Sequence, residues 1–495
     1  MSLHNRGSLE PYLPDSIKFY EHQTEGIRRM AFLKNFLLAD EMGLGKTVQS
    51  AAVYALDVFR DMGDTMCVVC PASLKGNWYD EMGKFTRIHR EILDGTPKKR
   101  SEQIEEFRQR PGAKILIVNY EQVVGHLREL VRCNFHVSLY DEAHYLKNPK
   151  AKRTAACHQF MTTRRFLLTG SPLLNHVNEL WSLLEMIEPG EWGKYYQFCN
   201  RYCVYGGYKD KQIVGVKNEK ELTARLQNVM IRRLKKDVLD LPPVQYVERP
   251  VDLHPNQKKY YDEVFGELKL TIAGQDTVEI QNALTKFLRL KQICGTTASI
   301  NPDAPDDDYS TKLDIATNDA DQILGSGHKI VAFTQFRSVQ DSYRKRILNI
   351  KRANKKGKME AAYEVFILNG DTPTDRRQEV VRQWANFNAK PAILICMYQV
   401  AGVGLNMTEA SHMQRLDRLF VPELNAQAVA RLDRIGQKNT VQVFDYIVRK
   451  TVEARVEKIV AQKKSVFENI VERDNWQAAV IAAAMEEDEQ RGNAA

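Results

Sequence analysis

The chain has 495 residues, of which 43% are hydrophobic and 27% are charged, and it carries a net charge of +8. At ~100–200 residues per domain this length fits about three domains, and the composition is that of an ordinary soluble protein with sizeable cores. The sequence has no secretory signal and no run of about 18 apolar residues, which excludes a secreted or membrane-spanning class, whereas the mild basic excess permits a polyanionic partner without proving one.

Residues 1–15 are expected to form a flexible leader, and 16–195 are predicted to form a first α/β lobe. Short, continuous apolar runs of strand length alternate there with longer amphipathic segments. This alternation is typical of βαβ units whose parallel sheet is buried on both faces. The runs predicted as strands are Phe36–Ala39, Met66–Cys70, Ile115–Val118, Phe135–Tyr140 and Arg165–Thr169.

The alternation lapses in the middle of the chain and then returns. Residues 196–310 are mostly helical in character and end in a turn-rich acidic segment, 301–308, which we interpret as an exposed linker. A second α/β lobe is predicted over 311–450, and a charged helical brace with an acidic tail over 451–495. The strands expected in the second lobe are Lys329–Thr334, Val365–Leu368, Ala392–Cys396 and Val441–Val448.

Eight cysteines are scattered along the chain, and only Cys67 and Cys70 have a CxxC spacing. They lie in an apolar run with no second Cys pair or His pair to complete a zinc site, so we interpret them as buried strand residues. The cysteine usage suits a reducing compartment. An intracellular location is therefore expected, in the cytoplasm or nucleoid of a prokaryote or phage or in the nucleus of a eukaryote.

The strongest local pattern is the segment Asp40–Thr47, DEMGLGKT, which follows an apolar strand and precedes a helix predicted over Val48–Phe59. This is the context that a phosphate-binding loop requires. Gly43 and Gly45 let the backbone approach phosphate closely, and the start of the helix adds oriented N–H donors.

Two further side chains of this segment carry chemistry, and one departs from the pattern. Lys46 can reach the β- and γ-phosphates of a nucleotide, and Thr47 can supply a hydroxyl ligand for Mg²⁺. The first position of the usual G-x-x-x-x-G-K-T pattern is Asp40 rather than glycine.

Asp141 and Glu142 directly follow the predicted strand Phe135–Tyr140. An acidic side chain at the carboxyl end of a parallel strand points into the ligand crevice of an open α/β sheet. Asp141 can hold Mg²⁺ through water, and Glu142 is placed to orient and deprotonate an attacking water. Alone, such a pair can be a helix N-cap, but with a phosphate loop upstream it predicts nucleotide hydrolysis.

These two segments resemble motifs I and II (DEAH-box-like) of the Swi/Snf family within helicase superfamily two. Other segments from Ile17 to Thr451 resemble the family's remaining motifs in order. They are Tyr20–Gln23 (Gln motif), Cys70–Trp78 (motif Ia), Leu168–Asn175 (motif III, with Ser171 where Thr is usual), Arg232–Leu239 followed by Leu241–Pro243 (the helical-protrusion signature), Phe333–Phe336 (motif IV), Gly370–Arg377 (the next block), Ala401–Asn406 (motif V) and Gln427–Gln437 (motif VI, with Asp433 where His is common).

The resemblance implies two RecA-like parallel-sheet lobes with helical protrusions between them and a C-terminal helical brace. It also implies an ATP- and Mg²⁺-dependent, DNA-dependent ATPase in which Gln23 contacts the adenine. Arg431 and Arg434 would face the nucleotide, and their spacing of three would put them on one face of a helix. Since the second lobe has no phosphate loop of its own, it must act across a cleft, with Arg434 as the arginine finger and Arg431 supporting it. ATP would then favour closed lobes and hydrolysis would reopen them.

A motor is expected to grip the nucleic-acid backbone, because phosphate contacts carry affinity without sequence information. Two basic clusters, Arg232 to Lys236 and Arg344 to Lys358, are compatible with nucleic-acid contact and equally with a solvated or packing surface. No aromatic-interleaved segment for stacking unpaired bases is present, which favours a duplex. By resemblance, the candidate contacts are Ser73, Lys75, Thr334, Gln335 and Gln399.

These features together predict a monomeric, ATP-dependent translocase on double-stranded DNA that remodels DNA or displaces DNA-bound proteins. A strand-separating DNA helicase is one alternative, because residue spacing does not separate duplex from single strand, or DNA from RNA. A nucleotide-dependent scaffold that hydrolyses little is another, although the full set of predicted catalytic residues argues against it. The sequence does not state the cargo, the pathway or the protein partners.

Overall fold

A computed structural model describes residues 12–14, 16–170, 177–206, 212–273, 277–300, 308–353, 357–373, 376–401, 405–419 and 422–454. The chain forms two compact units, Met1–Leu241 and Pro242–Ala495. In the described part, no helix combines the length and the apolar character needed to cross a lipid bilayer.

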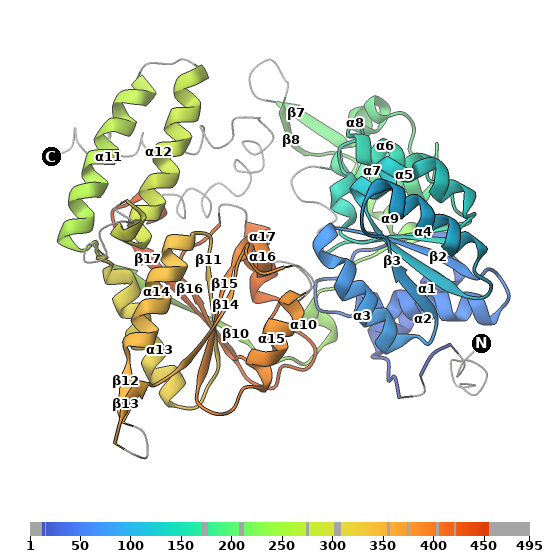
Figure 1. The fold of residues 1–495 in the computed structure, drawn as a ribbon. Coiled ribbons are helices and arrows are strands. Elements are labelled where there is room, and N and C mark those ends of the chain that lie inside the picture. The colour runs from blue at the N-terminus through green and yellow to red at the C-terminus, as the bar shows by residue number, and fades with distance from the viewer. Residues whose placement is uncertain are drawn as a thin grey trace. The chain divides into compact units, whose positions relative to one another are not determined.

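The first unit is built on a parallel sheet with helices on both faces (Figure 1, blue to green). Its described strands follow the order β3-β4-β2-β5-β6-β1-β9, and every neighbouring pair is parallel. Parallel strands need crossover connections, which the intervening helices provide. The strands are β1 (Asn35–Leu38), β2 (Thr65–Cys70), β3 (His89–Ile92), β4 (Lys114–Asn119), β5 (Val137–Tyr140), β6 (Arg164–Leu168) and β9 (Met230–Ile231).

Alternation along the strands divides the core of this unit between two helical layers. Leu37, Cys67 and Val69 point to one face and join a cluster with side chains from α4 to α9. The intervening residues point to the other face, where α1, α2 and α3 pack against one another. The helices are α1 (Glu21–Phe32), α2 (Lys46–Phe59), α3 (Lys75–Phe85), α4 (Pro97–Gln109), α5 (Tyr120–Arg132), α6 (Lys152–Gln159), α7 (Glu179–Ile187), α8 (Tyr195–Tyr202), α9 (Glu219–Val229) and α10 (Lys235–Val238), with 3₁₀ turns η2 (Ala72–Leu74) and η3 (Ala143–Leu146).

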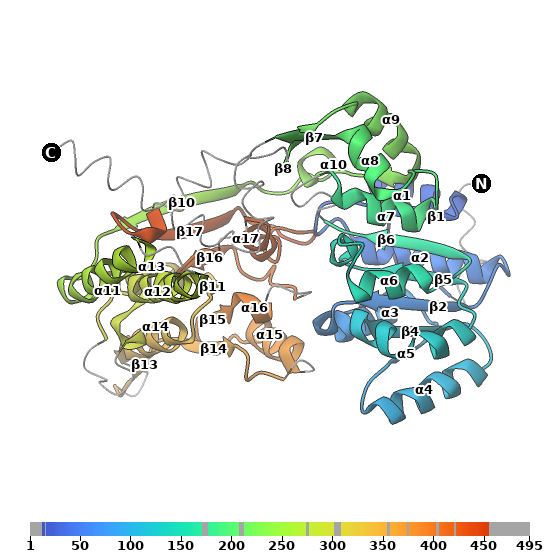
Figure 2. The same ribbon diagram turned by 90° about the horizontal axis from the view of Figure 1, so that it is seen from above.

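The second unit contains another parallel sheet, of order β10-β17-β16-β11-β15-β14 among the described strands. Strand β10 pairs with β17 over its whole length of eight residues, and Figure 2 shows the two strands side by side. The strands are β10 (Val244–Val251), β11 (Ile330–Thr334), β14 (Glu364–Leu368), β15 (Ala392–Met397), β16 (His412–Arg415) and β17 (Val441–Val448).

Helices cover both faces of the second sheet as well. Trp384 of α15 and Ala428 of α17 pack on one face with Phe333, while Leu313 of α13 and Tyr343 of α14 pack on the other. Helices α11 and α12 lie side by side, as Figures 1 and 2 show. The helices are α11 (Pro255–Ala273), α12 (Thr277–Gly295), α13 (Thr311–Gly325), α14 (Arg337–Asn349), α15 (Arg377–Asn386), α16 (Tyr398–Ala401) and α17 (Pro422–Val429), with the 3₁₀ turn η5 (Thr297–Ser299).

Every strand predicted from an apolar run is present, within one or two residues of its expected ends. The segment 196–310, expected as one helical insertion, is instead divided between the two units. Its early part adds β9 to the first sheet and the hairpin β7 (Cys203–Gly206) and β8 (Gln212–Val216), while its later part supplies β10, α11 and α12 to the second unit. Short or half-exposed strands such as β9 and β10 carry no continuous apolar run, so the sequence pattern missed them.

Two expectations about charged segments change in the structure. Asp308, at the end of the segment interpreted as an exposed linker, accepts hydrogen bonds from Thr296 and Ser342 and pairs with Arg346 at 2.9 Å. Arg352, in the hairpin β12 (Lys351–Ala353) and β13 (Met359–Ala361), pairs with Asp321 at 3.0 Å. These two arginines of the basic run Arg344–Lys358 therefore have intramolecular partners. The predicted brace and tail, 451–495, lie outside the described residues beyond 454.

Candidate nucleotide site and nucleic-acid contacts

The predicted phosphate loop lies between β1 and α2, as expected. Gly43 has a φ of 89° and Gly45 a φ of 78°, a region that residues with a side chain rarely adopt. A Cβ on Gly45 would also lie 2.4 Å from Gln23 Nε2. Both glycines are therefore required by the backbone, and α2 begins directly after them at Lys46.

Lys46 lies close to the acidic pair at the end of β5. Its Nζ donates to the carbonyl oxygens of Asp40 at 2.7 Å and Glu41 at 3.4 Å. Burial lowers the pKa of Lys46, while the charges of Glu142, Asp141 and Asp40 oppose that shift. The charges of the two predicted acids therefore act on the lysine of the loop. Thr47 follows Lys46 in the first turn of α2 and is half-buried.

Asp40, which replaces the usual first glycine of the loop, is buried and serves as an internal anion. Arg233 donates from Nε to Oδ1 at 2.9 Å and from Nη2 to Oδ2, and Gln49 Nε2 donates to Oδ2 at 3.2 Å. Arg232, next to it, donates to the carbonyl oxygens of Ala39 and Gly170. In the cluster Arg232–Lys236, these two arginines are packing residues that hold the segment after β9 against the phosphate loop.

Asp141 is fixed by neighbours on three elements. Its Oδ2 accepts from Trp78 Nε1 of α3 at 2.7 Å, its Oδ1 accepts from the Glu142 backbone N–H at 2.9 Å, and its carbonyl oxygen accepts from Tyr120 Oη of α5 at 2.7 Å. Burial raises the pKa of Asp141 to about 6, the Glu142 charge adds to that shift, and Trp78 and Lys46 oppose it. Trp78 was not among the residues selected from the sequence.

Glu142 has a backbone conformation that is uncommon for a residue with a side chain. Its φ and ψ are both 50°, in the left-handed region, at the start of η3. Its Oε2 lies 3.2 Å from Nδ1 of His144. Strain of this kind clusters at functional sites. Here it turns the chain immediately after β5, at the carboxyl ends of the strands, where the phosphate loop also lies.

Gln23 packs against the phosphate loop. Its Nε2 donates to the carbonyl oxygen of Leu44 at 3.3 Å, and its Oε1 accepts from the Tyr20 backbone N–H at 3.1 Å. His22 Nε2 lies 3.1 Å from the same Leu44 oxygen. Gln23 therefore lies at the loop, as the Gln-motif resemblance implies, while its contact with adenine stays a prediction.

The donor set of the first unit fits a magnesium nucleotide. Mg²⁺ prefers oxygen ligands and is usually held by one or two protein oxygens together with substrate phosphates. Thr47 offers a hydroxyl, and the Asp141 carboxylate keeps acceptor capacity beyond its two hydrogen bonds. Within the described ranges there is no group of three or more His, Cys, Asp or Glu side chains that could hold a metal alone.

The motif Ia candidates lie at the start of α3. Ser73 is half-exposed in η2. Lys75 has 12% of its side chain exposed, and its Nζ donates to the carbonyl oxygen of Leu93 at 2.8 Å, 3.8 Å from Asp94 Oδ1. Burial lowers the pKa of Lys75, which the Asp94 charge opposes. Lys75 therefore holds α3 to the end of β3 in this structure.

In the second unit, the motif IV candidates converge on a buried carboxylate. Asp417 accepts from the Thr334 hydroxyl, from the Gln335 backbone N–H at 3.1 Å and from Gln335 Nε2 at 2.9 Å. Thr334 is fully buried, whereas Gln335 is half-buried and Gln399 of α16 is exposed. The motif IV loop is thus ordered by Asp417, a residue that the sequence reading did not select.

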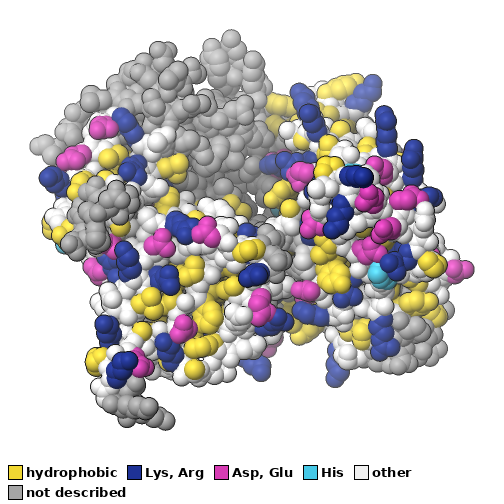
Figure 3. All heavy atoms as spheres, in the orientation of Figure 1, with side chains coloured by type: hydrophobic (Ala, Val, Ile, Leu, Met, Phe, Trp, Pro, Cys, Tyr) yellow, Lys and Arg dark blue, Asp and Glu magenta, His cyan; other side chains and the backbone are white. Residues whose placement is uncertain are grey.

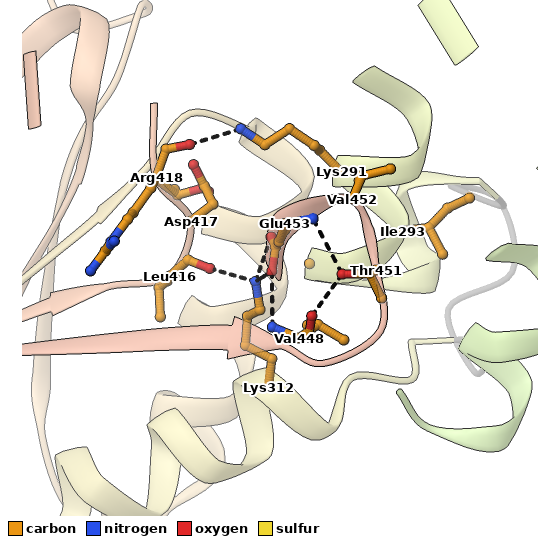
Figure 4. Close-up of polar contacts among 12 residues, drawn as sticks. Lys291, Ile293, Lys312, Leu416, Asp417, Arg418, Val448, Thr451, Val452 and Glu453 are labelled. Atoms are coloured by element: carbon orange, nitrogen blue, oxygen red, sulfur yellow. Dashed lines mark hydrogen bonds and ion pairs between the residues drawn. The ribbon is translucent and has the colours of Figure 1, made fainter. Parts of the chain in front are cut away.

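Two buried lysines surround the Asp417 segment (Figure 4). Lys291 Nζ donates to the Arg418 carbonyl oxygen at 2.7 Å. Lys312 Nζ donates to the Leu416 carbonyl oxygen at 3.0 Å and to both Glu453 oxygens at 2.7 and 2.8 Å. These contacts bind α12, α13 and the chain after β17 to the segment after β16.

Arg431 and Arg434 do not lie on a regular helix, which corrects the expectation that they share a helix face. Helix α17 ends at Val429, and the chain continues in tight turns in which Arg431 N donates to Ala428 O and Gln437 N donates to Arg434 O. Such i→i−3 bonds turn the chain more tightly than an α-helix does. Ser171 of motif III and residues 402–404 of motif V lie outside the described residues.

Surface charge does not by itself indicate a nucleic-acid-binding surface on the face drawn in Figure 3. Lys and Arg side chains are interspersed there with Asp and Glu over the described residues. The assignments of Ser73, Lys75, Thr334, Gln335 and Gln399 therefore remain predictions from the motif resemblance.

The first unit, with its glycine loop between strand and helix and its half-buried acidic pair at the end of a nearby parallel strand, defines a nucleotide-binding α/β protein of the phosphate-loop class. The chain belongs to the SNF2-related family. The family's SNF2-related domain matches residues 22–298, more than half of the chain, and a helicase conserved C-terminal domain matches residues 316–436.

Curated relatives are similar over most of this chain. A human "SWI/SNF-related matrix-associated actin-dependent regulator of chromatin subfamily A member 1" is 27% identical over 434 residues, covering 85% of this chain and 40% of its own length. A Mycoplasma pneumoniae protein named as an uncharacterized ATP-dependent helicase is 29% identical over 479 residues, covering 95% of this chain and 44% of its own length. The chain thus spans about 40% of the length of these relatives.

A solved structure, the "Sulfolobus solfataricus SWI2/SNF2 ATPase core in complex with dsDNA", is 26% identical and has a TM-score of 0.44. The match covers 95% of this chain and 96% of that one.

Proposed function

We propose that this chain is a DNA-dependent ATPase that translocates on double-stranded DNA and thereby remodels DNA or displaces bound proteins. The observation that carries the proposal is that the glycine-containing phosphate loop follows β1 and the pair Asp141 and Glu142 follows β5, at the carboxyl ends of strands of one parallel sheet. The charges of both acids act on the half-buried Lys46 and oppose the lowering of its pKa by burial. The chromatin-related name of the human relative and the helicase name of the Mycoplasma pneumoniae relative support nucleic acid as the track.

The proposed chemistry is hydrolysis of ATP. Lys46 and the backbone N–H groups of the loop bind the phosphates, and Glu142 orients a water and takes its proton. Thr47 and Asp141 hold Mg²⁺, which supplies charge neutralisation at the phosphates. The left-handed backbone of Glu142 turns the chain directly after β5, and the proposed base acts from this position.

The second unit is proposed to complete the site through Arg434, with Arg431 in support. An arginine directed at the γ-phosphate stabilises charge on its equatorial oxygens and is worth ~10³–10⁵ in rate in related enzymes. Hydrolysis would then require the two units to close on ATP, and alternate closure and opening would move units that each hold the backbone.

The primary test is ATP turnover by the full chain with blunt duplex, forked duplex, single-stranded DNA and RNA. We expect duplex DNA to raise turnover strongly, because closure depends on the track. Equal turnover with and without duplex would contradict the coupling. Glu142→Gln should abolish turnover while nucleotide binding persists, and unchanged turnover in this variant would refute Glu142 as the base.

A strand-separating helicase is the second candidate, supported by the helicase name of the Mycoplasma pneumoniae relative. Displacement of a triplex strand from blunt duplex should accompany ATP hydrolysis if the protein translocates on duplex. Release of a strand from a forked duplex without triplex displacement would instead establish the helicase. If the chain binds nucleotide but hydrolyses almost no ATP with any of these nucleic acids, the result would instead favour the nucleotide-dependent scaffold.

A further inference from the structure

Helix α3 contains both a proposed nucleic-acid contact and a contact to the proposed metal ligand. Lys75 begins this helix and Ser73 lies in η2 just before it. Trp78 follows one turn later, and its indole Nε1 donates to Asp141 Oδ2 at 2.7 Å. A single rigid turn of helix therefore separates a predicted phosphate contact from the carboxylate that we assign to Mg²⁺.

Trp78 is well placed to fix the orientation of that carboxylate. Only 1% of its surface is exposed, and Trp78 and Met82 are the buried side chains through which α3 packs on the unit. The other Asp141 oxygen is held by the backbone N–H of Glu142, so each oxygen has one defined donor. Partners of this kind set the direction in which a metal-binding carboxylate presents its remaining lone pairs.

The same contact connects the segments that follow two neighbouring strands of the sheet. Helix α3 follows β2, whereas Asp141 follows β5, and these neighbouring strands pair directly, with Val69 opposite Tyr140. The Asp141 backbone N–H also donates to the Val69 carbonyl oxygen at 2.8 Å. The sheet therefore holds the Asp141 backbone, whereas the Trp78 indole holds its carboxylate. A small rotation of α3 would reorient the carboxylate and leave the backbone hydrogen bond of the sheet intact.

We propose that Trp78 is a positioning residue that aligns the Asp141 carboxylate for Mg²⁺ and couples nucleic-acid contact at the start of α3 to ATP hydrolysis. This inference rests on the proposed function, because it takes Asp141 as a metal ligand and Ser73 and Lys75 as nucleic-acid contacts. Trp78 itself touches neither nucleotide nor nucleic acid in this assignment.

The test compares Trp78→Phe, which keeps an aromatic ring and removes the N–H, with Trp192→Phe. Trp192 is a matched control in the same unit, since it is also buried and its Nε1 donates to the Glu188 carboxylate at 3.0 Å. Binding of Mn²⁺ to the ADP complex of the full chain is measured by electron paramagnetic resonance, and ADP affinity is measured separately in EDTA.

We expect Trp78→Phe to weaken Mn²⁺ binding ~10-fold or more, the usual effect of removing a partner of a metal ligand. ADP affinity in EDTA should match that of Trp192→Phe, and stimulation of ATP turnover by duplex DNA should fall. Unchanged Mn²⁺ affinity would overturn the positioning role. Weakened Mn²⁺ binding with stimulation equal to that of the control would overturn the coupling.

A second replacement keeps the proposal testable if Trp78→Phe does not fold. Incorporation of benzothienylalanine at position 78 exchanges the indole N–H for sulfur in a ring of nearly the same shape, and the same two results are expected. A failure of the proposed function can be distinguished from a failure of this inference. If the proposed function is wrong, the unsubstituted chain itself shows no stimulation of ATP turnover by nucleic acid.

Discussion

At the scale of single residues, the first position of the phosphate loop has a structural role that its departure from glycine did not suggest. Asp40 is fully buried, and its carboxylate accepts hydrogen bonds from Nε and Nη2 of Arg233. These bonds connect the loop to the segment that follows β9. A buried pair of this kind is costly to break, since removal of one partner leaves the other charge uncompensated.

Arg233→Ala should therefore lower the free energy of unfolding of the first unit by about 3–5 kcal/mol. Urea denaturation followed by circular dichroism measures this change. Arg201→Ala is the matched control, because Arg201 pairs with Glu221 on the surface and more than half of its side chain is exposed. That exposed pair should contribute at most about 1 kcal/mol, and equal losses in the two variants would contradict the role assigned to Arg233.

At the scale of secondary-structure elements, both sheets place their polar groups at the carboxyl ends of parallel strands. In the first unit these ends hold the phosphate loop and the acidic pair, and in the second they hold Asp417 and the lysines around it. The Lys312–Glu453 pair joins α13 to the chain that follows β17, with 1% and 10% of the two side chains exposed.

Glu453→Leu should destabilise the second unit by about 3 kcal/mol, because the buried charge of Lys312 then keeps only the Leu416 carbonyl oxygen among its partners in the described structure. The double variant Lys312→Met, Glu453→Leu should lose less than the sum of the two single losses, since no buried charge remains. Urea denaturation of the four proteins gives the coupling energy, and strict additivity would show that the pair is not energetically linked.

His412 at the start of β16 gives the second unit a dependence on pH. Burial, together with the smaller effect of the neighbouring His328, lowers the pKa of His412 from 6.5 to about 4. The unfolded chain thus binds more protons than the folded chain between these two pKa values. The contribution to stability is fully present above about pH 6.5 and is lost as the pH falls toward 4.

His412→Gln should consequently lose less stability than the unsubstituted chain between about pH 7 and about pH 4.5. Urea midpoints at the two pH values measure this difference. His328→Gln should show only a smaller part of this effect, because it removes the second cause of the pKa shift and leaves the larger cause, burial of His412 by the other residues around it. If the urea midpoint falls equally between the two pH values in His412→Gln and in the unsubstituted chain, His412 is not the source of the pH dependence.

At the scale of the whole molecule, the proposed motor divides its chemistry between two units. The phosphate loop and the residues proposed as metal ligands and base belong to Met1–Leu241, whereas Arg431 and Arg434, the proposed arginine contributors, belong to Pro242–Ala495. A chain with this division can bind nucleotide with one unit alone and hydrolyse it only when the other unit contributes, which is how nucleic acid can control turnover.

Arg434→Ala should keep most of the affinity for ATP and reduce turnover by ~10³–10⁵, the usual contribution of an arginine finger. Nucleotide affinity and the duplex-stimulated rate are measured on the same preparation. Arg449→Ala is a suitable control in the same unit, because Arg449 is more than half exposed and lies 3.7 Å from Asp252. A turnover number close to that of this control would remove Arg434 from the mechanism.

The sequence by itself determined the strands that are continuous apolar runs and the local geometry of the phosphate loop. Continuous apolar runs predicted most central strands of both sheets, because a strand buried on both faces is usually apolar throughout. The exception is β16 in the second sheet, whose sequence His412–Arg415 contains a single apolar residue. The glycines of the phosphate loop were also predictable, since their left-handed backbone conformations disfavour other residues. The helix after them and the acidic pair after β5 follow from the same local rules.

Only the tertiary structure decided which side chains meet across the folded chain. Arg233 reaches Asp40 over 193 residues of sequence, Thr334 reaches Asp417 over 83, and Trp78 reaches Asp141 over 63. The order of strands in a sheet and the packing of helices on it place these residues together, and neither is encoded in local hydrophobic periodicity. A polar residue that reads as solvent-exposed in the sequence can therefore become the partner that orders a site.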